Sequence, residues 1–336
     1  MRNDRYSRQE LFQKIGKAGQ QKLSEAHVVI IGAGALGSAS SEMLTRAGAG
    51  RITILDRDYI EYSNLQRQQL YTEADADEGI PKAAAAQKRL RAINSGVKVE
   101  GIVEDVSPET FERFQQADLI IDALDNFETR MMINDASQKY KIPWIYGACV
   151  ASYGLSYTVL PGSKPCMHCI LGAVPAGGDT CDTVGVISPA VQIVASYQVA
   201  EAMKLLTGNM EALREELIQF DVWTNETRKI GVNRLKKDDC PSCGSTPEYP
   251  YLEKTSQTQT AVLCGRNTVQ VRPPGSLRFN ELKDRLSPYA PKANEHVLQV
   301  ELEGHRVVIF HDGRALIHDT NQKSKALALY QRYISG

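Results

Sequence analysis

A glycine-rich turn between an apolar run and a helix-like segment constrains the fold of this chain more than any other feature. The run His27–Ile31 is short and apolar, which is typical of a parallel strand covered on both faces. Gly32, Gly34 and Gly37 follow at once in the spacing G-x-G-x-x-G, and helical periodicity resumes over Leu36–Ala47. Such a turn presents backbone N–H groups and a helix N-terminus to a phosphate. The pattern therefore predicts a βαβ unit with a nucleotide site at the turn.

Strands and helices continue to alternate along the first half of the chain. We expect the following elements: strand 51–56, helix 81–94, strand 97–104, strand 118–122, helix 127–140 and strand 144–146. Three later strands, near 153–160, 216–223 and 227–232, surround one helix near 189–207. The sequence predicts an α/β fold with a Rossmann-like, mostly parallel sheet that antiparallel strands extend.

A polar, turn-forming stretch divides the chain into two expected domains. Residues 244–260 have the composition of a linker. A large domain is expected over 1–243. A small, separate α+β domain is expected over 261–336, and the sequence does not indicate its role.

Composition excludes several classes of partner. The chain has 39 basic and 40 acidic residues, so its net charge of −1 provides no field that would hold a nucleic acid. No stretch approaches the roughly 18 apolar residues that would span a bilayer, and the N-terminus has no apolar signal segment. Seven cysteines are an odd number and favour a reducing compartment. We expect a cytoplasmic protein that binds neither nucleic acid nor a membrane.

A carboxylate ends the second expected strand. Asp56 lies 24 positions after Gly32, where it can accept hydrogen bonds from ribose hydroxyls. The glycine turn and Asp56 alone favour a nicotinamide- or flavin-dependent oxidoreductase. The long polar segment 57–68, which ends in Asn-Leu-Gln-Arg-Gln, has no counterpart in that class of enzyme.

In this segment the chain resembles the ThiF/MoeB family of sulfur-carrier-protein adenylyltransferases, which share an adenylation domain with ubiquitin-activating enzymes. The resemblance extends from Tyr6 to about Cys243. The matching residues are Gly32, Gly34, Gly37, Asp56, Asn64, Arg67, Gln68, Lys82, Asp125 and Asn126. The resemblance implies that these residues bind ATP.

Adenylation explains why the family needs these residue types. When a carboxylate attacks the α-phosphate of ATP, negative charge grows on the departing pyrophosphate, so fixed cations and Mg²⁺ must face it. Arg67 and Lys82 are expected to supply the cations, while Asn64 and Gln68 hold phosphate oxygens. The resemblance implies that Asp125 holds Mg²⁺. Taken singly, Arg67 and Lys82 are also compatible with an ordinary solvated charge on the surface.

An N-terminal arginine matches a further family motif. Arg8 lies in the sequence Arg-Tyr-Ser-Arg-Gln at residues 5–9. The resemblance implies a homodimer in which Arg8 reaches the triphosphate of the neighbouring subunit, for which a guanidinium fork is well suited. The alternative is an exposed arginine on the first helix.

Four cysteines have the spacing of a metal site. Cys166 and Cys169 form one C-x-x-C pair, and Cys240 and Cys243 form a second. Four thiolates complete a tetrahedral Zn²⁺ site and leave no open position, so the zinc is expected to be structural. A redox pair is disfavoured because neither pair begins a helix after a βαβ strand.

A fifth cysteine has two interpretations. Cys181 lies in the glycine-rich stretch 177–185 and resembles the crossover-loop cysteine of the family. It is either a nucleophile that handles the acyl-adenylate or persulfide sulfur, or an inert thiol. Both remain open at this point, because Asp179 and Asp182 flank it and oppose thiolate formation.

The resemblance implies ATP-dependent adenylation of the C-terminal glycine carboxylate of a ubiquitin-like sulfur carrier with a Gly-Gly tail. A persulfide donor such as a cysteine desulfurase would then provide sulfur for a thiocarboxylate, in thiamin or molybdopterin biosynthesis. A nicotinamide-dependent oxidoreductase leaves Lys82 and the cysteine pairs unexplained. A non-catalytic scaffold for ubiquitin-like proteins does not require the phosphate-binding residues.

Overall fold

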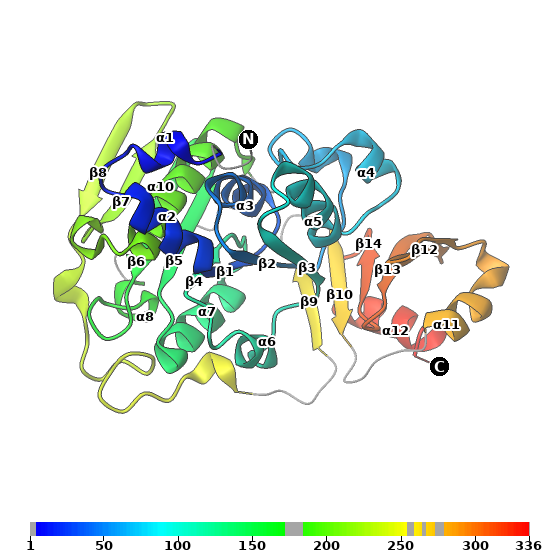
Figure 1. Cartoon of the computed structure of the whole chain (residues 1–336). Helices are drawn as coiled ribbons and strands as arrows, with labels where there is room; N and C mark the ends of the chain where they lie inside the picture. The colour runs from blue at the N-terminus through cyan, green and yellow to red at the C-terminus, as the bar shows by residue number, and fades with distance from the viewer. Residues whose placement is uncertain (1–4, 172–183, 254–258, 264–266, 273–278, 336) are drawn as a thin grey trace. The chain divides into compact units, whose positions relative to one another are not determined.

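The computed structural model describes residues 5–171, 184–253, 259–263, 267–272 and 279–335. The chain forms two compact units (Figure 1). The larger comprises Met1–Asp77 and Lys82–Glu253, and the smaller comprises Glu78–Pro81 and Lys254–Gly336. No helix in the described ranges is long and apolar enough to cross a membrane.

The larger unit is built on an eight-stranded sheet with the order β3-β2-β1-β4-β5-β6-β7-β8. The strands β3, β2, β1, β4 and β5 are parallel to one another, and β6, β7 and β8 continue the sheet in antiparallel fashion. This arrangement confirms the predicted fold class. The strands are β1 His27–Ile31, β2 Arg51–Asp56, β3 Lys98–Val103, β4 Leu119–Asp122, β5 Trp144–Val150, β6 Tyr153–Val159, β7 Leu217–Asp221 and β8 Glu226–Ile230.

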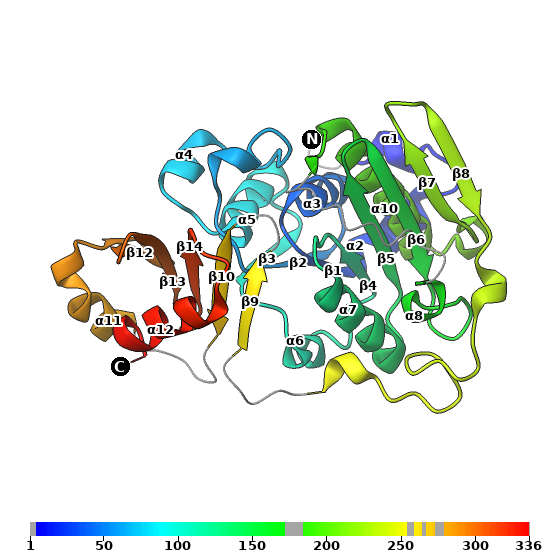
Figure 2. The same ribbon diagram turned by 180° about the vertical axis from the view of Figure 1, so that it is seen from behind.

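Helices cover both faces of this sheet (Figures 1 and 2). One face carries α2 Gly16–Glu25, α3 Ala35–Ala47, α5 Lys82–Ile93 and α10 Ser188–Thr207. The other carries α6 Pro108–Arg113, α7 Phe127–Tyr140 and α8 Met167–Ile170. Shorter elements are α1 Ser7–Glu10, α4 Glu73–Asp77 and the 3₁₀ turns η2 Tyr62–Asn64, η3 Met210–Ala212, η4 Asn233–Leu235 and η5 Pro250–Leu252.

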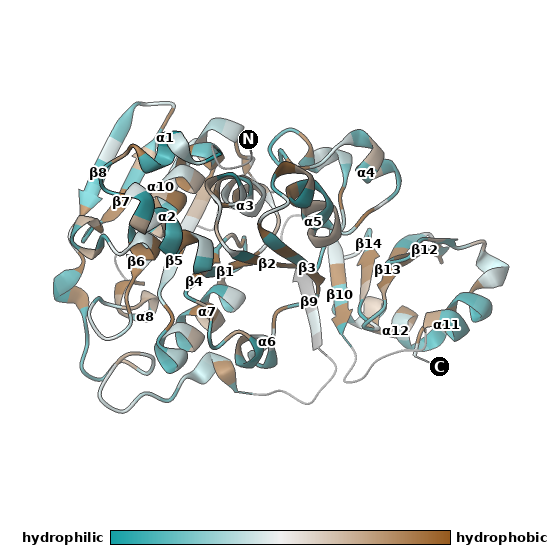
Figure 3. Ribbon diagram, in the orientation of Figure 1, coloured by the Kyte–Doolittle hydropathy of each residue, from teal (hydrophilic) through white to brown (hydrophobic). Residues whose placement is uncertain are grey.

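The central strands of this sheet are apolar, whereas the edge strand β8 is polar (Figure 3). In β1, Val28–Ile31 are all buried, and Trp144 of β5 is fully buried beneath α7. In β8, Thr227–Lys229 are exposed, and charged side chains on such an edge oppose pairing with another sheet. The buried strands fix the sheet, and its parallel order brings the carboxyl ends of β1, β2 and β4 to one edge.

The smaller unit has a six-stranded antiparallel sheet with the order β11-β12-β13-β14-β10-β9. Alternate strand residues, among them Val269, Leu298 and Ile309, form one core with Leu282 and Tyr330 of the helices. The elements are β9 Gln259–Leu263, β10 Thr268–Arg272, α11 Phe279–Arg285, η6 Ser287–Tyr289, β11 Lys292–Ala293, β12 Val297–Leu302, β13 His305–Phe310, β14 Ala315–His318 and α12 Lys323–Tyr333. A small α+β unit was expected from the sequence.

Candidate nucleotide site and metal centre

The glycine turn joins β1 to α3 at the carboxyl edge of the sheet. Gly32 has a φ of +102°, and a Cβ there would lie 2.5 Å from the carbonyl oxygen of Ala123 in the loop after β4. A Cβ on Gly37 would clash with the carbonyl of Gly32. At Gly34 the nearest atom to such a Cβ would be Nε2 of Gln68, at 3.9 Å. The first and last glycines therefore permit close backbone packing, while the middle one leaves open space.

Asp56 holds this turn from the end of β2. Its Oδ2 accepts a hydrogen bond from the backbone N–H of Ala33 at 2.6 Å. Its Oδ1 accepts one from the N–H of Asp58 at 2.7 Å. Burial raises the pKa of Asp56, and the positive charge of Lys82 opposes that rise. The predicted ribose-binding carboxylate thus lies at the turn, where it also fastens the backbone.

Lys82 is a buried cation beside this carboxylate. It begins α5, its side chain is 3% exposed, and its Nζ lies 3.4 Å from Oδ2 of Asp58. Its backbone N–H donates to the carbonyl of Asp58 at 2.9 Å. Because both its backbone N–H and its Nζ contact Asp58, Lys82 can present a positive charge in a fixed position. A solvated surface lysine would not be buried in this way.

Sequence reasoning missed Tyr71, which connects the turn to Lys82. Its buried hydroxyl lies 2.6 Å from the carbonyl oxygen of Ala33 and 3.3 Å from that of Lys82. Burial, followed by the charge of Asp56, raises the pKa of Tyr71 well above its usual value, so the phenol is a neutral donor. Its only sequence signal is an aromatic residue three positions after Gln68.

The polar segment after β2 folds into η2 and a following turn. Asn64 is buried, and its Oδ1 accepts the N–H of Glu61 at 3.1 Å, so part of its role is to cap η2. Arg67 donates from Nη1 to the carbonyl of Ser63 at 2.8 Å. Gln68 is 3% exposed, and its Oε1 has no hydrogen-bond partner among the described residues.

The loop after β4 contains a second feature that the sequence did not indicate, a buried ion pair. Nε of Arg130 on α7 lies 2.7 Å from Oδ2 of Asp122, the last residue of β4. Arg130 also donates to the carbonyls of Leu124 and Gly147. Burial raises the pKa of Asp122, and Arg130 opposes the rise. These bonds fix the backbone of the loop that ends at Asp125.

Asp125 and Asn126 follow in the same loop. Asp125 is exposed, so a solvated cation can reach its carboxylate. Its charge acts on Arg57, whose side chain is 23% exposed. The pKa of Arg57 is raised overall, because desolvation lowers it but the charges of Asp105, Asp58 and Asp125 raise it more. The Oδ1 of Asn126 accepts the N–H of Thr129 at 2.9 Å, so this residue caps α7. The sequence predicted only nucleotide binding for Asn126, and the structure adds a role as a helix cap.

Two observations fit a nucleotide at this edge of the sheet. Gly32 and Gly34 keep side chains away from the N-terminus of α3, which can therefore receive a phosphate. Beside them, the buried Oε1 of Gln68 has no donor in the described part of the chain, and a ribose hydroxyl would satisfy it. The cations Lys82, Arg67 and Arg57 come from the elements that follow β2.

Arg8 is not brought to this site within its own chain. The neighbouring Gln9 donates from Nε2 to the carbonyl of Ala47, the last residue of α3, at 3.0 Å. Tyr6 accepts a hydrogen bond from Asn94 at the end of α5, at 2.8 Å. The glycine turn lies at the other end of α3, and the 13 residues of that helix span about 20 Å. Arg8 is exposed on α1 at that distant end.

The four expected metal ligands lie together on the face of the sheet that α7 and α8 cover. Their Sγ atoms are all within 4.8 Å of one another. The Sγ–Sγ distance is 3.5 Å between Cys166 and Cys240 and also between Cys169 and Cys243. It is 4.0 Å between Cys166 and Cys169. A tetrahedron with Zn–S bonds of about 2.3 Å has edges of about 3.8 Å. The cluster therefore fits Zn²⁺. Cys181 lies outside the described residues.

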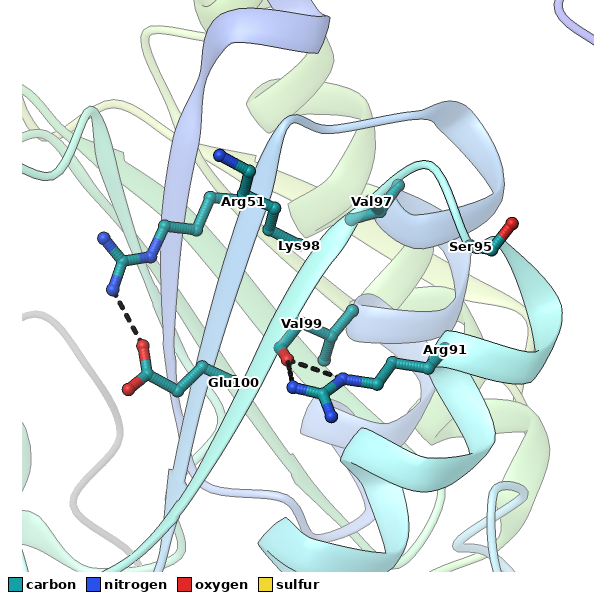
Figure 4. Close-up of a pocket in the computed structure, with 7 residues that line it drawn as sticks. All are labelled: Arg51, Arg91, Ser95, Val97, Lys98, Val99 and Glu100. Atoms are coloured by element: carbon teal, nitrogen blue, oxygen red, sulfur yellow. Dashed lines mark hydrogen bonds and ion pairs between the residues drawn. The ribbon is translucent and has the colours of Figure 1, made fainter.

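A surface hollow in the larger unit lies away from both sites (Figure 4). It is formed where β2 and β3 begin, whereas the glycine turn follows the carboxyl end of β1. Arg51 pairs with Glu100 at 2.7 Å, and Arg91 donates twice to the carbonyl of Val99. Three of its charged side chains, those of Arg51, Glu100 and Arg91, are thus engaged with the protein itself.

Comparison with known proteins gives a family and several relatives. The ThiF family matches residues 6–242. The sulfur carrier protein ThiS adenylyltransferase of Bacillus subtilis is 54% identical over 335 residues, with 98% of this chain and 99% of that protein covered. The sulfur carrier protein adenylyltransferase of Thermus thermophilus is 38% identical over 257 residues, with 74% of this chain and 93% of that protein covered.

Solved structures show the same fold. A crystal structure of E. coli MccB with ATP matches with a TM-score of 0.62 and 22% sequence identity. The match covers 72% of this chain and 74% of that chain. The likeness to the Bacillus protein, in contrast, extends over nearly the full length and so includes the smaller unit.

Proposed function

Because this chain belongs to the ThiF family, we propose that it is an adenylyltransferase that uses ATP to activate the C-terminal glycine carboxylate of a ubiquitin-like sulfur carrier protein. The observation that carries this proposal is the buried Lys82, held beside Asp58 and tied through Tyr71 to the glycine turn. Hydride transfer has no need of such a cation. Phosphoryl chemistry requires one.

The residues can be assigned roles in the reaction. A carboxylate oxygen of the carrier bonds to the α-phosphorus as the bond to the β-phosphate oxygen breaks, and pyrophosphate leaves with the electron pair. Lys82 and Arg67 stabilise the charge that develops on the leaving group. Asn64 and Gln68 hold phosphate and ribose oxygens, and Asp56 lies at the ribose. Mg²⁺, held by Asp125, would neutralise phosphate charge.

The position of α1 favours a shared active site. Arg8 lies at the end of α3 that is distant from its own glycine turn, so it is poorly placed to serve that site. We therefore propose a homodimer with twofold symmetry, in which Arg8 completes the site of the other subunit. A guanidinium there would add a second fixed positive charge at the triphosphate.

The four cysteines have a structural role in this proposal. Four protein ligands would leave Zn²⁺ no open position for a substrate, so the metal would stabilise the fold, not take part in adenylation. A zinc site needs its cysteines as thiolates, which a reducing compartment preserves. A cytoplasmic location is therefore part of the proposal.

Sulfur transfer follows adenylation. The terminal sulfur of a persulfide, delivered by a donor such as a cysteine desulfurase, attacks the acyl carbon, and AMP leaves. Cleavage of the resulting acyl disulfide by a thiol then releases the thiocarboxylate. The likeness to the Bacillus protein favours a ThiS-like carrier and thiamin biosynthesis over molybdopterin biosynthesis.

Carrier-dependent exchange of labelled pyrophosphate into ATP tests the proposal. We expect exchange with a carrier that ends in Gly-Gly, and none with a carrier that lacks the last glycine. Lys82→Ala should abolish exchange, whereas Lys88→Ala, which removes an exposed lysine from the same helix, should leave it unchanged. Absence of exchange with every carrier, by a folded protein that binds ATP, would favour a non-catalytic scaffold.

A further inference from the structure

We propose that Asn134 and Asp135, neighbours on α7, position the two cysteine pairs for the metal, one pair each. Neither residue is a metal ligand, and neither contacts the nucleotide site. Both side chains are fully buried. Their role is independent of which carrier the enzyme activates.

Asn134 holds the first cysteine pair through its backbone. The Oδ1 of Asn134 accepts a hydrogen bond from the N–H of Met167 at 2.8 Å, and both residues are buried. Met167 follows Cys166 directly and begins α8, the turn on which Cys169 lies. The bond therefore satisfies an N–H that has no partner within the short helix, and it fixes the turn that aims both thiols.

Asp135 holds the second pair through Ser242. The Oδ1 of Asp135 accepts the hydroxyl of Ser242 at 2.5 Å, and Ser242 lies between Cys240 and Cys243. The Oδ2 of Asp135 accepts the N–H of Tyr251 at 2.9 Å. The carboxylate therefore anchors both the cysteine turn and the chain that leaves it.

The two anchors are also connected to each other. The Nδ2 of Asn134 lies 3.4 Å from Oδ1 of Asp135. On the other side, Nδ1 of His168, which lies between the first two cysteines, is 3.3 Å from Oγ of Ser242. Ser242 thus contacts both α7 and the opposite cysteine turn. The polar groups form a continuous chain from one pair to the other.

The cost of burying Asp135 supports a positioning role. A buried carboxylate loses its hydration, and an apolar side chain would pack α7 at no such cost. Each oxygen of Asp135 is instead matched to a donor from the segment 242–251. Seventy residues separate Cys169 from Cys240. Because α7 already holds both cysteine turns in place, zinc binding costs less conformational entropy than it would with two free turns.

Release of zinc from the full-length zinc-loaded protein to a chromogenic chelator tests this role. Asp135→Asn and Ser242→Ala should each weaken zinc binding by about 10-fold or more, as is usual when a hydrogen bond behind a metal ligand is lost. The loss of zinc affinity in the double variant should be smaller than the sum of the two single losses, because both changes act on the bond between Asp135 and Ser242. Asn134→Ala should also weaken zinc binding, because the N–H of Met167 loses its acceptor.

Ser137→Ala is the matched control. Ser137 lies on the same helix and loses an equivalent buried bond, from its Oγ to the carbonyl of Ile142 at 2.6 Å, but it does not touch either cysteine turn. It should retain wild-type zinc affinity while losing comparable thermal stability. Wild-type zinc affinity in both Asp135→Asn and Ser242→Ala would overturn the proposal, as would equal loss in Ser137→Ala. If Asp135→Asn does not fold, the smaller change Ser242→Ala decides the question.

Discussion

The hydroxyl of Tyr71 lies 2.6 Å from the carbonyl oxygen of Ala33. Through this bond, a residue that follows the polar segment 57–68 reaches back to the glycine turn after β1. The same hydroxyl is 3.3 Å from the carbonyl of Lys82, so one side chain relates the turn to the first residue of α5. The separation between the glycine turn and the buried Lys82 therefore depends on a side chain that contacts both.

Tyr71→Phe should raise the KM for ATP several-fold and lower the free energy of unfolding by about 1 kcal/mol, because it removes one buried hydrogen bond but keeps the ring. Tyr157→Phe is the control, since its hydroxyl bonds to the carbonyl of Pro165 at 3.2 Å in the core. The control should lose similar stability with an unchanged KM. Steady-state kinetics and denaturant unfolding give both values. An unchanged KM in Tyr71→Phe would assign its bond to stability alone.

Asp125→Ala should abolish carrier-dependent pyrophosphate exchange with little effect on the melting temperature. Asp125 is exposed, so its loss leaves no cavity, but the proposed magnesium ligand is removed. Glu128→Ala, which removes an exposed carboxylate from the first turn of α7, should retain exchange. Near-wild-type exchange in Asp125→Ala would reject its assignment to magnesium.

Removal of zinc should lower thermal stability before it alters adenylation. Binding free energy becomes folding free energy when separated ligands share one metal, so Cys240→Ser should melt at a lower temperature than the wild type. Cys149→Ser, a substitution in β5 outside the cluster, should retain the metal. Elemental analysis should find about one zinc per chain in the wild type. Finding no zinc would end this assignment.

Arg8→Ala and Asp125→Ala should each be inactive alone and should complement each other when mixed. With random subunit exchange, half of the dimers contain one chain of each kind. In those dimers, the Arg8→Ala chain keeps Asp125 and borrows the intact arginine, while the other site has both lesions. About a quarter of wild-type activity should return. If exchange is demonstrated and no activity returns, Arg8 does not act across the dimer.

Cys181→Ala should leave carrier adenylation unchanged, because attack on the α-phosphate requires no thiol. Formation of the thiocarboxylate should fail if the thiol is the nucleophile, and mass spectrometry of the carrier reports this step separately. Thiocarboxylate formation at the wild-type rate would identify Cys181 as inert. Loss of pyrophosphate exchange would contradict the placement of this residue in sulfur transfer.

Local patterns were sufficient for some parts of the site. The glycine turn, Asp56 and the cysteine pairs each have a characteristic spacing, because one short segment must fold in one way to serve its purpose. The alternation of strands and helices likewise predicted the parallel half of the sheet and its antiparallel extension.

Contacts between segments were not visible in the sequence. Tyr71 meets a carbonyl 38 residues away, and only the folded sheet brings them together. Arg130 lies eight residues after Asp122, but a buried ion pair and an exposed arginine on a helix have the same sequence signal. Asn126 was predicted from a sequence motif to bind the nucleotide, but its hydrogen bond shows that it also caps α7. Dual roles of this kind become apparent only from the hydrogen bonds.

The contacts of α7 limit the insertions and deletions that this chain can tolerate. Arg130 faces the loop after β4, and Asn134 and Asp135 face the cysteine turns, all on one helix. Each residue of an α-helix advances the side-chain direction by about 100°. One residue added or removed between positions 130 and 134 would therefore turn one set of contacts away while the other stayed in place. Substitutions on the exposed side of α7 are harmless by comparison, but its length between these positions is fixed.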